Sequence, residues 1–171
     1  MMRCEECGHE VTVDSNAVRR YDFGGLPHII LRGLRVIRCP GCDAEEIGVP
    51  KIEQLHRVLT THFLNQTRPL APTELRFLRK HIGLSTVDFA KNVGVTRETV
   101  SRWENGAPPM GAVADRLVRL LVATSTPVMD YTAKNALCGI DSTLPVPKRL
   151  PEFALTTSPD GWRPERKPAA A

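Results

Sequence analysis

The chain has 171 residues and a mass of 19.0 kDa, which suits one domain or two small ones. Hydrophobic residues make up 42% and aromatic residues 5%, so we expect a buried core but no aromatic surface for sugars or stacked single-stranded bases. The net charge of +4 is concentrated in residues 68–126, where Lys and Arg outnumber Asp and Glu by nine to five. This basic excess is a weak indication of phosphate-backbone binding, and charge alone does not exclude an ordinary solvated surface.

The sequence has no run that approaches the roughly 18 apolar residues of a membrane span. Its first ten residues, M-M-R-C-E-E-C-G-H-E, also lack the apolar segment of a signal peptide. We therefore expect a cytoplasmic protein with no membrane partner.

Four of the five cysteines form two C-x-x-C pairs, in C-E-E-C-G-H at residues 4–9 and in C-P-G-C-D at residues 39–43. A C-x-x-C turn brings two thiolates to one side of the chain, and two such turns supply the four sulfurs of a closed structural zinc site. The expected ligands of one Zn²⁺ per chain are Cys4, Cys7, Cys39 and Cys42. The alternative is free or disulfide-bonded pairs, although lasting disulfides are rare inside cells.

Iron is a second candidate metal, because the pattern C-x-x-C-G…C-P-x-C also resembles rubredoxin, an iron electron carrier. Rubredoxins surround their metal with a dense aromatic core, whereas the segment between the two pairs offers only Tyr21 and Phe23. Asp43 also follows the second pair where that family has Gly. His9 could act as a replacement ligand, but a solvated loop histidine is the simpler interpretation.

Between the two pairs, apolar residues mix with arginines over residues 17–39, a pattern typical of strands with one solvent-facing side. Residues 52–63 then carry apolar side chains at three- and four-residue steps, which predicts a helix. Prolines end this pattern, and we expect a domain boundary near residues 66–71. The sequence thus predicts a small zinc-binding domain of mixed β and α structure over residues 1–67.

The next segment is predicted to be entirely helical. Pro72 suits a first helical turn, an S-x-x-D capping box begins at Ser85, and Thr96 is a good N-cap. The expected helices are residues 72–82, 86–93, 97–105 and 112–125. The last of these carries Val113 and the leucines at 117, 120 and 121 on one side, more than one bundle face needs. We therefore expect this helix, or the segment after it, to contribute a homodimer contact.

Residues 86–105 match the helix-turn-helix template position by position. Their sequence is T-V-D-F-A-K-N-V-G-V-T-R-E-T-V-S-R-W-E-N. Ala90 is small where the helices cross, and Gly94 allows the turn between them. The spacing of buried positions falls on Phe89, Val93, Val95, Val100 and Trp103. The residues expected to face DNA in the major groove are Thr96, Arg97, Glu98, Ser101, Arg102 and Asn105.

Arg102 and Arg97 are the best candidates for DNA contacts, because an arginine can make two hydrogen bonds to guanine. Arg97 could instead hold a phosphate. Glu98 can also be explained as a favourable helix-start residue, and Ser101 as neutral surface. Glu104 is expected to pair within the domain.

Seven prolines and few apolar clusters mark residues 127–171, which we expect to be a largely flexible extension, with a short helix conceivable at 127–142. The expected fold class is α+β: the zinc-binding domain, a λ-repressor-like helix-turn-helix domain over residues 68–126, and this extension. The sequence offers no residues for an enzymatic reaction, so we expect no catalytic activity.

The order of these features resembles the MqsA (YgiT-type) antitoxins of type II toxin–antitoxin systems. The similarity covers residues 1–125 and includes R-Y-D-F-G-G…L-R-G…R-C-P-G-C-D and L-S-x-x-x-F-A-x-x-x-G-V-T-x-x-T-V-S-R-W-E-N-G. It implies a zinc domain that binds a toxin, usually an mRNA-cleaving ribonuclease, and a dimeric helix-turn-helix domain that binds a palindromic operator and represses its own operon. The four cysteines carry over as zinc ligands and Arg102 as the recognition arginine, while the family's Asn reader falls on Glu98.

Two other hypotheses remain open from the sequence. One is a zinc-containing helix-turn-helix transcription regulator with no toxin partner, and the other is an iron electron carrier fused to a DNA-binding domain. A neighbouring gene for a small basic ribonuclease would separate the first from the antitoxin hypothesis, and a red iron-bound protein would indicate the second.

Overall fold

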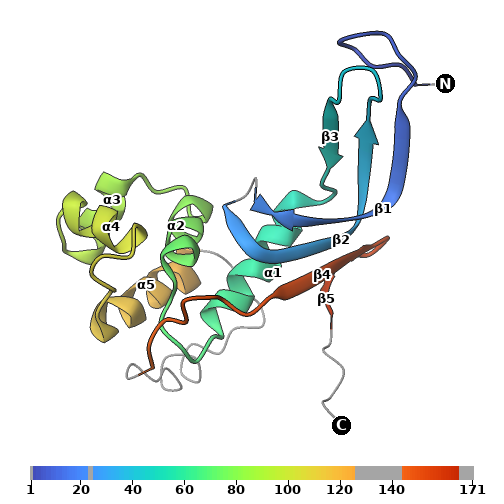
Figure 1. Ribbon diagram of the computed structural model, residues 1–171. Helices are drawn as coiled ribbons and strands as arrows, with labels where there is room; N and C mark the ends of the chain where they lie inside the picture. The colour runs from blue at the N-terminus through green and yellow to red at the C-terminus, as the bar shows by residue number, and fades with distance from the viewer. Residues whose placement is uncertain (1, 23–24, 126–143, 166–171) are drawn as a thin grey trace. The chain divides into compact units, whose positions relative to one another are not determined.

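The computed structural model describes residues 2–22, 25–125 and 144–165. Figure 1 shows its elements in chain order: β1 (Thr12–Tyr21), β2 (Leu26–Arg38), β3 (Glu45–Gly48), α1 (Ile52–Leu64), α2 (Pro72–His81), α3 (Thr86–Val93), α4 (Arg97–Glu104), α5 (Ala112–Ser125), β4 (Phe153–Ser158) and β5 (Gly161–Pro164). The expected α+β class is confirmed. Cys138 and the helix considered at 127–142 lie outside the described residues. In the part that is described, no helix is long and apolar enough to cross a membrane.

The chain divides into two compact units, and the first is built from both ends of the sequence. The cysteine unit comprises residues 1–23, 27–55 and 151–171, and the helical unit comprises residues 24–26 and 56–150. The division falls inside α1, whereas the sequence placed a boundary near residues 66–71. The helical unit is therefore inserted, in sequence, between two parts of the cysteine unit.

The sheet of the cysteine unit has the strand order β1-β2-β4-β5, and β3 pairs with a second stretch of β2. β2 runs parallel to β4 over Ile29–Arg32 and antiparallel to β3 over Arg35–Arg38. Gly33 lies where β2 changes partner, with a φ of 75° in the left-handed region that favours glycine. A Cβ at this position would lie 2.8 Å from the Thr157 side chain. Gly33 thus allows one long strand to serve two neighbours.

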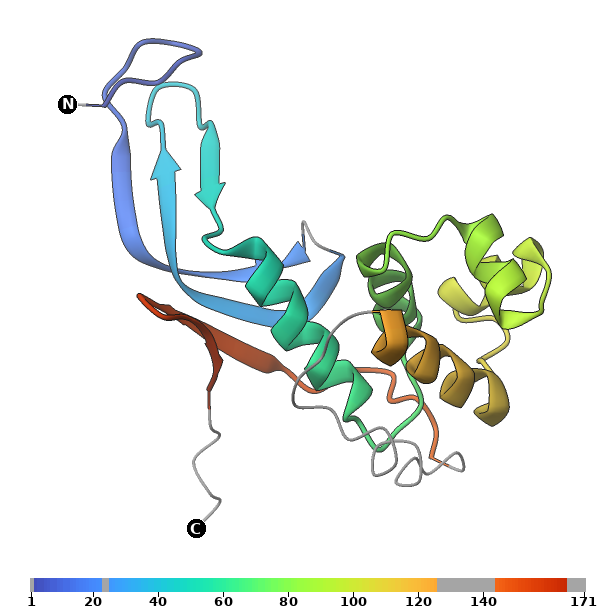
Figure 2. The ribbon, with the colours of Figure 1, turned by 180° about the vertical axis from the view of Figure 1, so that it is seen from behind.

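The strands β4 (Phe153–Ser158) and β5 (Gly161–Pro164) give regular structure to one part of the segment that the sequence predicts to be largely flexible. They form an antiparallel pair beside β2, as Figures 1 and 2 show, with Leu155 and Trp162 buried. The Trp162 indole Nε1 donates a hydrogen bond to the Pro50 carbonyl at 2.6 Å, and Lys51 Nζ donates to the Pro159 carbonyl at 2.8 Å. These partners are more than 100 residues away, so the local abundance of prolines concealed them.

In the helical unit, Arg119 of α5 fixes the segment in which the sequence predicts a domain boundary. Its guanidinium is fully buried and bonds the Asp115 carboxylate at 2.6 Å. Its remaining N–H groups donate to the carbonyls of Phe63, Leu64, Gln66 and Arg68 at 2.8–3.0 Å. Asp115 also accepts the Leu70 N–H at 2.7 Å. A buried guanidinium with every partner in place holds the end of α1 and the following segment against α5.

Candidate metal centre and nucleic-acid interface

The first C-x-x-C segment folds into a tight knuckle. The Cys4 N–H donates to the His9 carbonyl, and the Gly8 N–H donates to the Cys4 carbonyl, both at 2.9 Å. Gly8 has a φ of 74°, a conformation that few residues other than glycine adopt readily. These bonds close the turn so that the side chains of both cysteines leave it on one side.

The second C-x-x-C segment repeats the same backbone geometry. The Cys39 N–H donates to the Ala44 carbonyl at 2.9 Å, and the Asp43 N–H donates to the Cys39 carbonyl at 3.0 Å. Asp43 has a φ of 58° and takes the place that Gly8 has in the first knuckle, because aspartate tolerates this conformation better than most side chains. The Gly41 N–H additionally points at Cys39 Sγ, 3.4 Å away.

The two knuckles bring all four sequence-predicted ligands together. The sulfur atoms of Cys4, Cys7, Cys39 and Cys42 lie within 4.8 Å of one another. The closest pairs are Cys7–Cys39 at 3.3 Å and Cys4–Cys42 at 3.6 Å, and all four thiols are free. Four sulfurs placed about 2.3 Å from one tetrahedral ion would be separated by roughly 3.8 Å. The cluster therefore fits a single four-coordinate metal ion. His9, considered as a replacement ligand, is not part of it.

The thiols of Cys39 and Cys42 differ widely in pKa. Burial raises the pKa of Cys39, but hydrogen bonds from the Cys7 thiol and from the backbone of Gly41 and Cys42 outweigh burial and lower that pKa to about 6. The Ala44 backbone lowers the pKa of Cys42, yet the Cys7 thiol and burial prevail and raise it to about 12. Four thiolates this close repel one another, and a bound cation supplies the positive charge that lets all four ionise.

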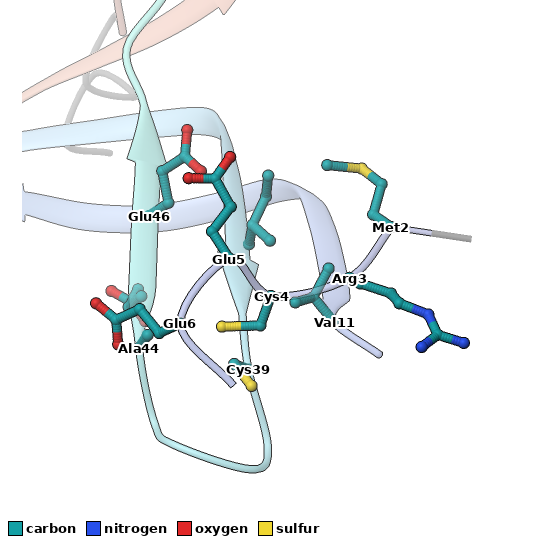
Figure 3. Close-up of a pocket in the computed structure, with 11 residues that line it drawn as sticks. Met2, Arg3, Cys4, Glu5, Glu6, Val11, Cys39, Ala44 and Glu46 are labelled. Atoms are coloured by element: carbon teal, nitrogen blue, oxygen red, sulfur yellow. The ribbon is translucent and has the colours of Figure 1, made fainter. Parts of the chain in front are cut away.

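Acidic side chains surround the cysteines. A cleft beside them is lined by four glutamates, Glu5, Glu6, Glu45 and Glu46, by Arg3, and by apolar residues that include Val11 and Ile37. Figure 3 shows Glu5, Glu6, Glu46 and Arg3 together with Cys4 and Cys39. The charge of Glu45 is compensated by ion pairs with Arg19 and Arg38, whose hydrogen bonds also lower the pKa of its carboxyl group. The other carboxylates leave the rim of this cleft negatively charged.

The helix-turn-helix has the caps that the sequence predicts. Ser85 Oγ accepts the Asp88 N–H at 3.1 Å at the start of α3, and Gly94 ends that helix with a φ of 74°. Thr96 Oγ1 accepts the Thr99 N–H at 3.2 Å at the start of α4. Each cap satisfies a backbone group that a short helix would leave free, so the sequence itself sets both helix starts.

The inner face of α4 differs from the prediction in one respect. Val100 is fully buried as expected, but Trp103 is only half-buried, and Glu104 takes the inward position with 8% of its surface exposed. Glu104 binds Arg79 of α2 through two hydrogen bonds, which confirms that it pairs within the domain. A charged pair with complete hydrogen bonding can occupy the interior where the sequence pattern placed an aromatic ring.

Arg79 and Arg76 are residues that the sequence analysis did not identify, because a charged side chain on a helix is ordinarily exposed to solvent. Arg79 is buried, and Arg76 donates to the Glu104 carbonyl and to Asn105 Oδ1 at 3.0 and 3.1 Å. A signal was present for Arg79, because it lies four residues after Leu75 on the buried stripe of its helix. Together the two arginines fix the C-terminal end of α4.

All six residues predicted to face DNA are exposed, namely Thr96, Arg97, Glu98, Ser101, Arg102 and Asn105. At 100° per residue, Glu98 and Arg102 point most directly away from the buried Val100 and Glu104. Two of the six are already engaged: Thr96 caps the helix, and Asn105 accepts a bond from Arg76. Arg102 makes one weak contact, with Thr99 Oγ1 at 3.4 Å, so its guanidinium can turn to an external partner.

The side of α5 that the sequence highlighted is largely solvent-exposed. Val113, Leu117 and Leu120 are 79%, 38% and 42% exposed, whereas the buried side consists of Asp115, Val118, Arg119 and Val122. The buried stripe has helical spacing, but two of its four members are charged, and for this reason a hydrophobic pattern does not reveal it.

Comparison with known proteins gives a match for part of the helical unit. The helix-turn-helix family model matches residues 75–121, from α2 into α5. No curated protein and no solved structure matches the chain. The chain thus combines a helix-turn-helix domain, the fold of a DNA-binding transcription regulator, with a four-cysteine cluster compatible with a metal ion.

Proposed function

We propose that this protein is an antitoxin of a type II toxin–antitoxin system, without enzymatic activity of its own. Its helical unit binds a palindromic operator as a homodimer and represses its own operon, and its zinc-loaded cysteine unit neutralises a cognate toxin. The observation that carries the proposal is the exposed polar face of α4, fixed by Arg79 and Glu104 in a chain that also gathers four free thiols.

Charge supports the DNA-binding half. Lys and Arg outnumber Asp and Glu by 13 to 7 in the helical unit, while the cysteine unit has 10 against 12. A basic helix-turn-helix unit attracts the phosphate backbone, and an α4 arginine can then read a base edge in the major groove. Arg102, at the centre of the exposed face, is the proposed reader, and Arg97 is a base or phosphate contact.

Zinc is the proposed metal because four cysteine thiolates from two knuckles form a closed, four-sulfur donor set. When bound, such an ion stabilises the fold of the unit that holds it. Iron accepts the same ligands, but the surroundings here are acidic and contain few aromatic residues.

A homodimer is proposed because a palindrome presents two equivalent half-sites about one helical turn apart. The exposed stripe of Val113, Leu117 and Leu120 on α5 supplies an apolar surface for this contact. The interface would place one copy of α4 on each half-site.

Toxin binding is supported by the resemblance to the MqsA family and by the acidic rim of the cysteine unit, which complements a basic ribonuclease. The experiment is to express the product of the adjacent gene alone, with the full chain, and with the Cys39→Ser variant. Growth arrest that the full chain relieves and the variant does not is the expected result. Operator binding without any relief of toxicity would instead favour a zinc-containing transcription regulator with no toxin partner.

A further inference from the structure

The two knuckles share one backbone geometry, but their side chains differ at two positions that face the other knuckle. Two residues after the first cysteine, one knuckle has Glu6 and the other has Gly41. Five residues after the first cysteine, the same knuckles have His9 and Ala44. The large His9 lies against the glycine, and the large Glu6 lines the same cleft as the alanine.

The contact between His9 and Gly41 is so close that a side chain at residue 41 would displace the His9 ring. A Cβ added to Gly41 would lie 2.6 Å from both Cγ and Nδ1 of the His9 ring and 3.1 Å from Cε1. Gly41 is not among the residues with positive φ, so its backbone would accept another amino acid. The glycine therefore provides space for the ring, because the imidazole occupies the volume that a side chain at residue 41 would fill.

Both residues of this contact also belong to the hydrogen-bonded backbone of the knuckles. The His9 carbonyl accepts the Cys4 N–H at 2.9 Å, and the Gly41 N–H points at Cys39 Sγ from 3.4 Å. Cys7 and Cys39 are the closest pair of sulfurs, at 3.3 Å, and they belong to different knuckles. The ring of His9 on the backbone of Gly41 thus joins the two knuckles directly beside this pair.

We propose that His9 is a positioning residue of the metal centre, whose imidazole rests on Gly41 and sets the separation of the two knuckles. The inference rests on the proposed metal binding and assigns His9 no bond to the metal. The separation of the knuckles depends on the size of the His9 ring. A ring of similar size should therefore replace His9, whereas a methyl group should leave the knuckles free to separate.

The test uses the full chain loaded with zinc or cobalt. The rate of zinc transfer to a chromophoric chelator reports how firmly the knuckles hold the ion, and the cobalt absorption spectrum reports the ligand atoms. His9→Ala should release zinc about 10-fold faster with an unchanged four-sulfur spectrum, and His9→Phe should behave like wild type. Gly41→Ala should release zinc about 10- to 100-fold faster.

The decisive variant combines His9→Ala with Gly41→Ala, because removal of the ring removes the clash. This double variant should hold zinc more firmly than Gly41→Ala alone.

Gly111→Ala is the matched control, since Gly111 has neither a positive φ nor any atom within 4 Å of an added Cβ. Fluorescence of the buried Trp162 reports whether the cysteine unit is folded. A Gly41→Ala chain that folds only when His9 is also replaced would support the contact between the His9 ring and Gly41.

The results that would overturn the proposed metal function differ from those that would overturn only the inference about His9. A wild-type chain that binds neither metal would overturn the proposed metal function and the inference with it. A wild-type chain that binds metal, with Gly41→Ala indistinguishable from Gly111→Ala or with a double variant no better than Gly41→Ala, would overturn the inference alone. A changed cobalt spectrum in His9→Ala would show that His9 is a ligand and not a positioning residue.

Discussion

Arg79 of α2 holds Glu104 of α4 through two parallel hydrogen bonds, Nε to Oε1 at 2.6 Å and Nη2 to Oε2 at 3.1 Å. The two side chains are only 9% and 7% exposed. This pair joins the last turn of the recognition helix to the helix that opens the matched domain. Its geometry determines where the exposed residues of α4 point.

Loss of one partner of this pair should unfold the helical unit at lower denaturant concentration. Arg79→Ala leaves the Glu104 carboxylate buried without its counter-charge, which costs about 3–5 kcal/mol. Urea unfolding followed by circular dichroism measures the change. The control is Arg163→Ala, which removes an ion pair whose side chains are 68% and 79% exposed and which should leave stability nearly unchanged. Equal midpoints for the two variants would contradict the role given to Arg79.

The C-terminal strands should be required for a stable cysteine unit. Trp162→Ala removes a buried indole and its bond to the Pro50 carbonyl, with an expected cost of about 3–5 kcal/mol. Thermal unfolding and retention of metal against a chelator measure the loss. Leu144→Ala is the control, because Leu144 is 44% exposed. A fragment of residues 1–67 lacks β4 and β5, so we expect it to hold metal less firmly than the full chain. Equal metal retention by the two would contradict this prediction.

Acid should weaken the α1–α2 contact of the helical unit. The rings of His56 and His81 lie 6.0 Å apart, both against Phe77. Burial lowers the pKa of both imidazoles. A nearby group lowers each pKa further, namely His81 for His56 and Arg57 for His81. The folded state therefore binds fewer protons than the unfolded state. Stability should be complete above the unfolded pKa of about 6.5 and should be lost as the pH falls through the lower folded values.

The measurement is the melting temperature of the full chain as a function of pH. A variant with both His56→Gln and His81→Gln should lose less stability on acidification than wild type does, because it lacks the two groups that must take up protons. Replacement of His62 by Gln provides the comparison, because His62 lies on the same helix as His56. Parallel pH curves for wild type and the double variant would show that these imidazoles do not carry the effect.

The exposed stripe on α5 should mediate self-association. Leu117→Asp together with Leu120→Asp places two charges on the proposed contact and should convert a dimer to a monomer in sedimentation experiments without DNA. Val87→Asp on α3 is the matched control, since Val87 is also exposed, at 43%. A wild-type chain that is monomeric at micromolar concentration would contradict the assignment of this surface.

The candidate site was predictable where its signals are local. A C-x-x-C knuckle fixes two thiols within a few residues, and the caps at Ser85 and Thr96 act on backbone groups three residues away. The spacing of polar residues on α4 likewise predicted which side chains are exposed. Each of these features depends on the geometry of a single turn or helix.

The remaining features depend on partners far away in the sequence. The pairing of β4 with β2 joins segments more than 100 residues apart, and no local pattern distinguishes its apolar residues from a proline-rich tail. Arg79 and Arg119 are buried because each meets a specific carboxylate, whereas a hydrophobicity pattern treats every arginine as surface. The actual inner faces of α4 and α5 were therefore visible only in the structure.

The most direct test of the proposed operator recognition is the binding of wild type and Arg102→Ala to operator and scrambled duplexes at one salt concentration. The variant should lose about 1–3 kcal/mol of discrimination at one base pair in each half-site, because the guanidinium can no longer bond a guanine edge. Arg97→Ala is the companion variant, and if Arg97 holds a phosphate it should weaken binding to both duplexes alike. An unchanged ratio of the two affinities in Arg102→Ala would contradict the assignment of Arg102 as the base-reading residue.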